Sequence, residues 1–339
     1  MHIESLHLAD YSDERESDRV SVRQLERVCM LNMRNLNAWY NALRPFSYPA
    51  SIVPVIVGTM VAWQIRKVDL TLFFLTLLGS MAIQAATNLA NEYLDYVQGV
   101  DKEDSLGPAG VIIKGELLPK QVAWAAVFAF TVGSVIGFYL TLRVGWFILL
   151  IGVASVLAAW FYTAKPLALG YRGLGEPEVF FFMGPIMVMS AYYVQTQSLA
   201  WTPLLVSLPI GFLVMAILHA NNLRDIVQDD QRNRLTWVVL AYRGFGARRG
   251  KMFSIRLYCI MTTAPYFIIF ILASFGVVPL LTLLTFFTAP EAYGLVRFVY
   301  SGVEGKPLSR LVRGTARFHM LFGATLALAY TLDLLLRHL

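Results

Sequence analysis

Long apolar blocks free of Asp, Glu, Lys and Arg run through most of this sequence and restrict what it can fold into. A helix needs about 20 such residues to cross the hydrocarbon core of a bilayer. Four blocks of that length cover residues 45–65, 70–91, 121–142 and 144–164. Two longer runs, 179–223 and 257–290, each have room for two helices, and a last block follows Arg317. Since a membrane-spanning backbone must satisfy its own hydrogen bonds, we expect an all-α polytopic membrane protein with nine transmembrane helices.

The overall composition agrees with a membrane protein. Hydrophobic residues make up 57% of the 339 residues and charged residues only 15%, whereas charged residues are about 25% of a typical soluble domain. A secreted or nuclear globular protein is therefore excluded, and we expect the lipid bilayer, not nucleic acid, as the extended partner. Cys29 and Cys259 indicate neither a disulfide framework nor a metal site.

The first part of the chain differs from the rest. Residues 1–40 are polar and mixed in charge, and no basic stretch is followed there by an apolar one. We therefore expect no cleavable signal peptide. We expect residues 1–40 to form a cytosolic N-terminal tail and residues 41–339 to form one transmembrane domain.

The positions of the basic residues predict which loops face the cytoplasm, because lysine and arginine are retained on that side of a membrane. Most of the 28 Lys and Arg residues lie in the tail and in the even-numbered connections between the nine expected helices. The opposite side holds only a few, namely Arg66, Lys67, Arg143 and Arg337. We therefore place the tail and the even connections in the cytoplasm, with the protein in a cell inner membrane or an equivalent one.

A first polar cluster lies at the cytoplasmic end of the second expected helix. Asn88, Asn91 and Asp95 are spaced i, i+3 and i+7, so they share one face of a helix, and Asp101 follows them. Carboxylates and amides gathered in this way offer several oxygen atoms to a cation.

A second polar cluster, within HANNLRDIVQDD, lies at the cytoplasmic end of the sixth expected helix. It comprises Asn221, Asn222, Asp225 and Asp229, and the first, third and fourth of these share a helix face. Mg²⁺ prefers oxygen ligands and usually binds through carboxylates together with substrate phosphates. The two polar clusters could therefore hold a diphosphate between them.

Other interpretations of the clusters are open at this point. Asn and Asp commonly cap helices, but two such clusters on one membrane side fit a shared ligand better than solvated helix ends. A transporter would place ionisable residues near the bilayer midplane, whereas these gather at one membrane face. A phosphatidyl-type alcohol transferase would need a single closely spaced aspartate cluster with Gly and Arg, which the sequence lacks.

Four segments, in order, resemble the UbiA-type intramembrane prenyltransferase superfamily, and they are most similar to its 1,4-dihydroxy-2-naphthoate prenyltransferases. They are NEYLDYVQGVD (91–101), GVIIKGEL (110–117), YTAKPLALGYRGLGE (162–176) and NNLRDIVQD (221–229). The resemblance extends from about residue 43 to the end of the chain. Two positions depart from the family pattern. Glu92 stands where many members have Asp, and Arg232 or Arg234 must supply the charge of a common Gly-Lys pair.

The resemblance implies both a fold and a cofactor. The fold would be a bundle of nine helices around a central cavity that opens to the cytoplasmic side. The cofactor would be Mg²⁺, bridging the protein to the diphosphate of a prenyl donor. The implied metal ligands are Asn91, Asp95, Asp101, Asp225 and Asp229.

Further residues are implied to act on the substrates. Lys114, in the apolar stretch VIIKGEL, and Arg44 are expected to contact the departing diphosphate. A snorkelling lysine and a topology anchor are the respective alternatives. We expect Lys114, Asp95 and Asp225 to be catalytic, whereas His219 lies off the Asp225 face and is expected to pack inside the protein. The other substrate-binding residues are expected to be Asn88, Tyr162, Lys165, Arg172 and Asn222.

The expected function is Mg²⁺-dependent transfer of a polyprenyl group from a prenyl diphosphate to a small aromatic acceptor. The resemblance favours 1,4-dihydroxy-2-naphthoate, in menaquinone or phylloquinone synthesis, as the acceptor. In the similar enzymes the acceptor ring attacks the allylic cation that the diphosphate leaves, and loss of carboxylate accompanies prenylation. The alternative acceptors 4-hydroxybenzoate, homogentisate and a chlorophyll precursor would need the same motifs and differ only in the pocket.

Overall fold

The computed structural model describes residues 36–99 and 110–337, and these residues form helices and loops without a strand. The all-α prediction is thus confirmed for the described part. Asp101 and residues 1–35 of the predicted tail lie outside it.

The helices follow the apolar blocks of the sequence, and local capping fixes where some of them begin. The side chain of Asp69 accepts a hydrogen bond from the Leu72 amide at 3.1 Å and so starts α3. The α-helices are α2 (Pro49–Trp63), α3 (Leu70–Val97), α4 (Pro119–Val144), α5 (Trp146–Phe161), α6 (Gly175–Phe181), α7 (Met187–Thr196), α8 (Trp201–Gln231), α9 (Trp237–Phe245), α10 (Ala247–Ser274), α11 (Ala289–Tyr300) and α12 (Ser309–Arg337). Short segments of other helical type are η1 (Pro45–Ser47), η2 (Leu169–Tyr171), η3 (Phe182–Ile186), η4 (Leu280–Thr288) and η5 (Lys306–Leu308).

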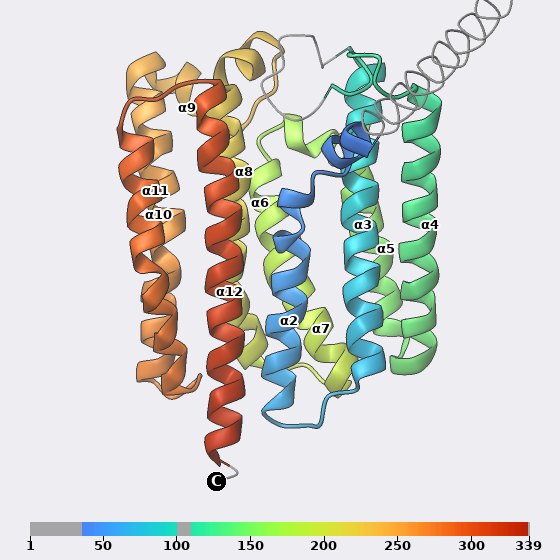
Figure 1. Ribbon diagram of the computed structural model, residues 1–339, viewed down its shortest axis with the longest axis vertical. Helices are drawn as coiled ribbons and strands as arrows, with labels where there is room; N and C mark the ends of the chain where they lie inside the picture. Colours follow the sequence, from blue (N-terminus) through green and yellow to red (C-terminus); the bar gives the residue numbers. More distant parts are fainter. Residues whose placement is uncertain (1–35, 100–109, 338–339) are drawn as a thin grey trace, which may run out of the picture.

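The long helices stand side by side and run alternately up and down (Figure 1). In this view α4 and α5 lie at one side, α10 and α11 lie at the other, and α2, α8 and α12 lie between them. The first and last long helices are neighbours, because Gln64 Nε2, just after α2, donates to the Tyr330 carbonyl oxygen of α12 at 2.9 Å. The C-terminal ends of α3 and α8, which carry the two polar clusters, are at the same end of the bundle.

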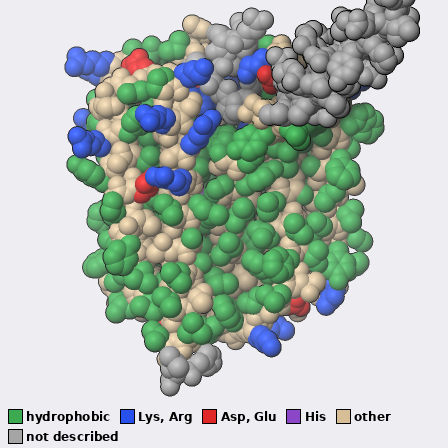
Figure 2. All heavy atoms as spheres, viewed as in Figure 1, with side chains coloured by type: hydrophobic (Ala, Val, Ile, Leu, Met, Phe, Trp, Pro, Cys, Tyr) green, Lys and Arg blue, Asp and Glu red, His purple; other side chains and the backbone are tan. Residues whose placement is uncertain are grey.

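The surface has the character of a membrane protein. Hydrophobic side chains cover most of the face drawn in Figure 2, and Lys and Arg gather mainly toward one end. Trp124, Phe128 and Phe287 are each at least 70% exposed. Extensive apolar surface of this kind needs a lipid environment, so the chain is an integral membrane protein.

The helices differ in whether they are long enough to cross a membrane. By length and composition, six helices in the described ranges can each cross a membrane, or seven when a bent pair is counted as one span. The predicted fourth span corresponds to α5, which has only 16 residues. The predicted eighth span, at the end of the block 257–290, corresponds mostly to the nine-residue η4, and the 12-residue α11 lies largely beyond it. The expected count of nine therefore stays a prediction.

The bent pair is the predicted first span. Residues 36–47 and 49–63 meet at 42°. At the bend Arg44 has a left-handed backbone, with φ 52° and ψ 60°, and the next residue is Pro45. A proline disfavours right-handed helical backbone in the residue before it, so the helix breaks here and a new one starts at Pro49.

Glycines allow the inner helices to approach closely. A Cβ atom on Gly58 of α2 would lie 2.3 Å from the Val188 carbonyl oxygen of α7. A Cβ atom on Gly323 of α12 would lie 2.2 Å from Val53 Cγ1 of α2. The main apolar core consists largely of residues from α2, α8, α10 and α12, and it supports one wall of the cavity described next.

Candidate active site

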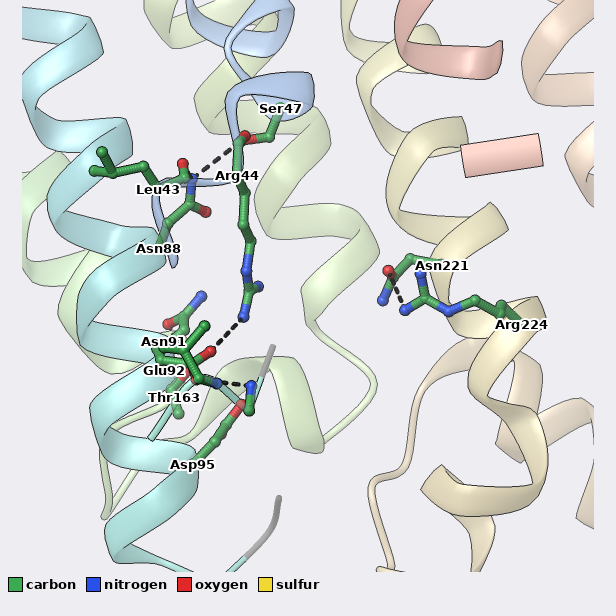
Figure 3. Close-up of polar contacts among 12 residues, drawn as sticks. Leu43, Arg44, Ser47, Asn88, Asn91, Glu92, Asp95, Thr163, Asn221 and Arg224 are labelled. Atoms are coloured by element: carbon green, nitrogen blue, oxygen red, sulfur yellow. Dashed lines mark hydrogen bonds and ion pairs between the residues drawn. The ribbon is translucent and has the colours of Figure 1, made fainter. Parts of the chain in front are cut away.

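A cavity of about 580 Å³ lies among α2, α3, α4, α5, α7 and α8. Much of its wall is apolar, with residues such as Ile83, Ile148 and Met187. Figure 3 shows polar residues of α3 on one side and Asn221 of α8 on the other. The cluster residues that line the cavity are Asn88, Asn91, Asp95, Asn221 and Asn222. The structure therefore brings together two motifs that are far apart in the sequence.

The two amides of the first cluster are held by neighbouring segments. Asn88 Nδ2 donates to the Leu43 carbonyl oxygen at 2.8 Å and to Ser47 Oγ at 3.1 Å. Asn91 Oδ1 accepts a hydrogen bond from Thr163 Oγ1 at 2.7 Å. Asn88 thus ties α3 to the bend of the first span, and Asn91 ties it to the loop after α5.

Asp95 is the buried carboxylate of the first cluster, with 6% of its surface exposed. Tyr171, the last residue of η2, donates its hydroxyl hydrogen to Asp95 Oδ1. Burial raises the pKa of Tyr171, and the nearby Asp95 carboxylate raises it further. The phenol therefore stays protonated and acts as a donor to Asp95.

Unlike Asn91 and Asp95 on α3, Glu92 binds backbone amides and an arginine and does not line the cavity. Its Oε1 atom accepts hydrogen bonds from the amides of Gly110 and Val111, at 2.7 and 2.8 Å. Its Oε2 atom lies 3.4 Å from an Arg44 guanidinium nitrogen. Glu92 is 1% exposed, so it is a buried clamp that joins the first span, α3 and the turn at 110–117.

Asp225 and Asn221 of the second cluster accept hydrogen bonds from the same arginine, Arg224. Arg224 Nε donates to Asp225 Oδ1 at 2.7 Å, and its terminal nitrogen donates to Asn221 Oδ1 at 2.7 Å. The guanidinium compensates the charge of Asp225. Asp225 lies beside the cavity and is not among its lining residues.

The second amide of that cluster belongs to a buried network. Asn222 Nδ2 donates to Glu176 Oε1 at 2.8 Å, and His219 Nδ1 lies 3.6 Å from the same oxygen. His219 is fully buried, and its Nε2 lies 3.0 Å from the Ser254 carbonyl oxygen. The network joins α6, α8 and α10 and gives His219 the packing position that the sequence predicted.

Arg234 supplies a positive charge between the clusters. Its guanidinium carbon lies 4.3 Å from the centre of the Tyr171 ring, and its Nη1 lies 3.6 Å from Asp229 Oδ1. Arg234 also lines the cavity. The preceding Asn233 has φ 53°, a left-handed conformation that Asn tolerates and Gly adopts readily. Of the two arginines that the sequence left open for this charge, Arg234 is the one that lines the cavity.

Not every predicted residue reaches the cavity. Arg44 and Tyr162 line it, as expected for substrate-binding residues. Lys114, Lys165 and Arg172 have exposed side chains and are not among its lining residues. Asp229 is buried beside Arg234 and likewise does not form part of the wall.

The donor set suits a magnesium ion that is shared with a substrate. In residues 36–99 and 110–337, no three His, Cys, Asp or Glu side chains are close enough to form a protein-only metal site. Asn91 and Asp95 nevertheless contribute an amide and a carboxylate to the cavity wall, and Asn221 lines the cavity from α8. Mg²⁺ commonly binds one or two carboxylates and completes its shell with water and substrate phosphates, so these residues fit it.

Sequence reasoning missed two residues of the site. Tyr171 lies inside the recognised YTAKPLALGYRGLGE segment, but its spacing gave no sign that it would contact Asp95. Glu178 lines the cavity with its Oε2 atom buried and without a hydrogen-bond partner among the described residues. The sequence did contain a signal for Glu178, because a lone carboxylate at the start of a long apolar run is costly to place in a membrane and indicates a functional site.

Comparison with known proteins decides the family. The model of the UbiA prenyltransferase family matches residues 51–334. The chain belongs to this family. The 1,4-dihydroxy-2-naphthoate octaprenyltransferase of Mycobacterium leprae is 29% identical over 300 residues, which cover 88% of this chain and 98% of the relative. The enzyme of the same name from Bacillus subtilis is 36% identical over 197 residues, 58% of this chain and 63% of the relative. The UbiA family member is thus a prenyltransferase, as predicted, and the transporter alternative has no support.

Solved structures agree with the UbiA fold. A UbiA homologue from Aeropyrum pernix has a TM-score of 0.58 and 12% identity, with 85% of this chain and 97% of that chain covered. A UbiA homologue from Archaeoglobus fulgidus, solved with GPP and Mg²⁺, has a TM-score of 0.55 and 13% identity, with 85% and 99% covered. At this identity the likeness establishes the fold.

Proposed function

We propose that this UbiA-family protein transfers a polyprenyl group from a prenyl diphosphate to 1,4-dihydroxy-2-naphthoate in a Mg²⁺-dependent reaction. The proposal includes a transmembrane domain of nine spans over residues 41–339, a cytosolic tail over residues 1–40, and an active site that faces the cytoplasm. The naphthoate acceptor is supported by relatives named for it at 29–36% identity.

The observation that carries the proposal is the meeting of the two polar clusters at one apolar cavity. Asn91 and Asp95 come from α3, and Asn221 comes from α8. A diphosphate needs cations and hydrogen-bond donors, whereas a polyprenyl chain needs apolar surroundings. A cavity with both characters suits a prenyl diphosphate.

The residues divide the work on the donor. Arg44 and Arg234 line the cavity and would bind the diphosphate oxygens, stabilising the negative charge that grows as the leaving group departs. Bound at Asn91, Asp95 and the phosphates, with Asp101, Asp225 and Asp229 as further proposed ligands, Mg²⁺ would neutralise the same charge. Lys114, proposed to contact the diphosphate, would have to turn inward from its exposed position.

Bond breaking and bond making then follow along the cavity. The bond between the prenyl C1 atom and the diphosphate oxygen breaks, and the oxygen keeps the electron pair. The apolar wall excludes water from the allylic cation, and the rings of Phe46, Tyr162 and Phe182 in that wall would stabilise it. The ring carbon that carries the carboxylate forms the new bond to C1. Its bond to the carboxylate then breaks, carbon dioxide leaves, and the released electron pair restores the aromatic ring.

Glu178 would hold the acceptor. Its unpartnered Oε2 atom is buried at the cavity wall and could accept a hydrogen bond from an acceptor hydroxyl. Asn88, Asn222, Tyr162, Lys165 and Arg172 complete the proposed set of substrate-binding residues, the first three of them at the cavity wall.

Product formation tests the proposal directly. Detergent-purified protein is incubated with geranylgeranyl diphosphate and 1,4-dihydroxy-2-naphthoate, with Mg²⁺ or with chelator, beside Asp95→Asn and Asp225→Asn. We expect prenylated naphthoquinol that requires Mg²⁺ and falls at least about 100-fold in both variants. Turnover only with another aromatic acceptor would change the assigned acceptor and keep the reaction. No diphosphate release with any acceptor would refute the proposal.

A further inference from the structure

Tyr171 belongs to neither polar cluster, but it contacts Asp95 of the first cluster and Arg234, which lies beside Asp229. It ends η2, in the connection between α5 and α6. Its hydroxyl donates to Asp95 of α3, and its ring lies under the guanidinium of Arg234, which follows α8. One side chain therefore touches both sides of the site.

Backbone contacts hold Tyr171 in this position independently of its side chain. The Leu235 amide donates to the Tyr171 carbonyl oxygen at 3.0 Å. Trp237 Nε1 donates to the Gly173 carbonyl oxygen at 2.8 Å. The loop that carries Tyr171 is thus bonded to the segment after α8, and the ring is presented to Arg234 from a fixed support.

Arg234 depends on that support. Its Nε atom is buried and has no hydrogen-bond partner among the described residues, and its distance from Asp229 is 3.6 Å. A planar guanidinium stacks on an aromatic face, whereas a lysine ammonium has neither the plane nor the fixed fork. The ring of Tyr171 is therefore a main determinant of where the Arg234 fork points.

We propose that Tyr171 is a positioning residue that couples the two sides of the diphosphate site, orienting Asp95 through its hydroxyl and Arg234 through its ring. The proposal rests on the diphosphate site of the proposed function. It predicts two separable effects, one on the metal side and one on the phosphate side.

Three variants separate the effects. Tyr171→Phe removes the hydroxyl and keeps the ring, Tyr171→Leu removes both, and Arg234→Lys keeps the charge but loses the stacked fork. The measurement is equilibrium binding of the unreactive donor analogue geranylgeranyl thiolodiphosphate to the purified full chain, over a series of Mg²⁺ concentrations and in chelator.

Each variant has its own expected result. Tyr171→Phe should raise the Mg²⁺ concentration for half-maximal binding about tenfold, because Asp95 loses a charge-assisted hydrogen bond, and should leave binding in chelator unchanged. Tyr171→Leu and Arg234→Lys should each weaken binding in chelator about fivefold. The double variant should bind no more weakly than Arg234→Lys alone, because both changes remove the same stacked contact.

A second tyrosine–arginine pair gives a matched control. Arg143 lies over the ring of Tyr139 at 5.9 Å and donates to its hydroxyl at 3.0 Å, on an exposed part of α4. Tyr139→Phe and Tyr139→Leu should leave both binding constants unchanged. The proposal would be overturned if the double variant Tyr171→Leu/Arg234→Lys lost as much binding in chelator as the two single variants together. An unchanged Mg²⁺ requirement in Tyr171→Phe would also overturn it.

Hydrogen exchange distinguishes failure of this proposal from failure of the proposed function. If the unmodified chain binds no donor analogue, the proposed function fails, but the coupling can still be measured without ligand. Tyr171→Leu should then speed amide exchange in residues 91–97 and 232–237, while thermal melting establishes that the variant is folded. Unchanged exchange in both segments would overturn the coupling. Arg234→Lys tests the same coupling by changing the arginine instead of the tyrosine.

Discussion

Replacing Glu92 tests whether the turn after α3 is held from inside the protein. The carboxylate accepts two amide hydrogen bonds, at 2.7 and 2.8 Å, and pairs with Arg44 at 3.4 Å. Glu92→Ala leaves all three groups without this partner. Breaking a buried ion pair from one side costs about 3–5 kcal/mol. Because the Arg44 side chain is 20% exposed, we expect the lower end, about 3 kcal/mol.

Glu92→Gln separates the two kinds of contact. Its amide oxygen can still accept both backbone hydrogen bonds, and only the ion pair to a partly exposed arginine is lost. That loss should cost about 1 kcal/mol. At about 2 °C per kcal/mol for a chain of this size, the melting temperature should fall by about 2 °C for Gln and about 6 °C for Ala.

Differential scanning fluorimetry of the purified protein in one detergent, at one scan rate, measures both shifts. Glu116 lies in the same turn with an exposed side chain, so Glu116→Ala and Glu116→Gln are matched controls and should shift the melting temperature by less than about 1 °C. If Glu92→Ala melted within 1 °C of Glu92→Gln, the backbone hydrogen bonds would contribute nothing and the clamp would be refuted.

Three further results are expected. Glu178→Leu should raise the KM for the aromatic acceptor about tenfold, since it removes the buried oxygen proposed to bind the acceptor hydroxyl. Steady-state kinetics measure the KM, and an equal loss of donor binding would contradict the assignment. Gly58→Ala should destabilise the protein by about 2 kcal/mol in thermal melting, because its Cβ would meet the Val188 carbonyl oxygen at 2.3 Å. Gly294→Ala, where nothing lies within 4 Å, should be neutral or stabilising, and equal losses at both glycines would be inconsistent with the steric reasoning. Asn233→Gly should keep activity and stability, whereas Asn233→Val should lose about 1 kcal/mol of stability because of the left-handed backbone; an equally stable Val variant would argue against that strain.

The sequence predicted the helices best where an apolar block is long and ends in polar residues. The blocks at 70–91 and 121–142 became α3 and α4, and α3 continues to Val97, so that its last turns carry Asn91 and Asp95 at the cavity. The block at 257–290 was harder to divide, since hydropathy alone does not distinguish a straight span from η4 followed by α11.

The site shows where periodicity stops being informative. Asn91 and Asp95 were placed on one helix face, and both line the cavity. Lys165 and Arg172 sit in a loop, where side-chain direction follows from turn geometry that no repeat encodes, and both are exposed. Glu92 could not be assigned its clamp from sequence, because its partners at 110 and 111 are backbone amides and carry no residue-specific signal.

The contact between α2 and α12 has a consequence for how the protein is made. Gly323 packs on Val53, and Gln64 bonds to the Tyr330 carbonyl oxygen, so α2 gains this neighbour only when the last helix has been synthesised and inserted. Until then α2 lacks one neighbour, and the bundle is an assembly intermediate in which surface meant for protein faces lipid or other chains. A chain cut short before α12 would therefore keep both polar clusters but leave the face of α2 around Val53 uncovered.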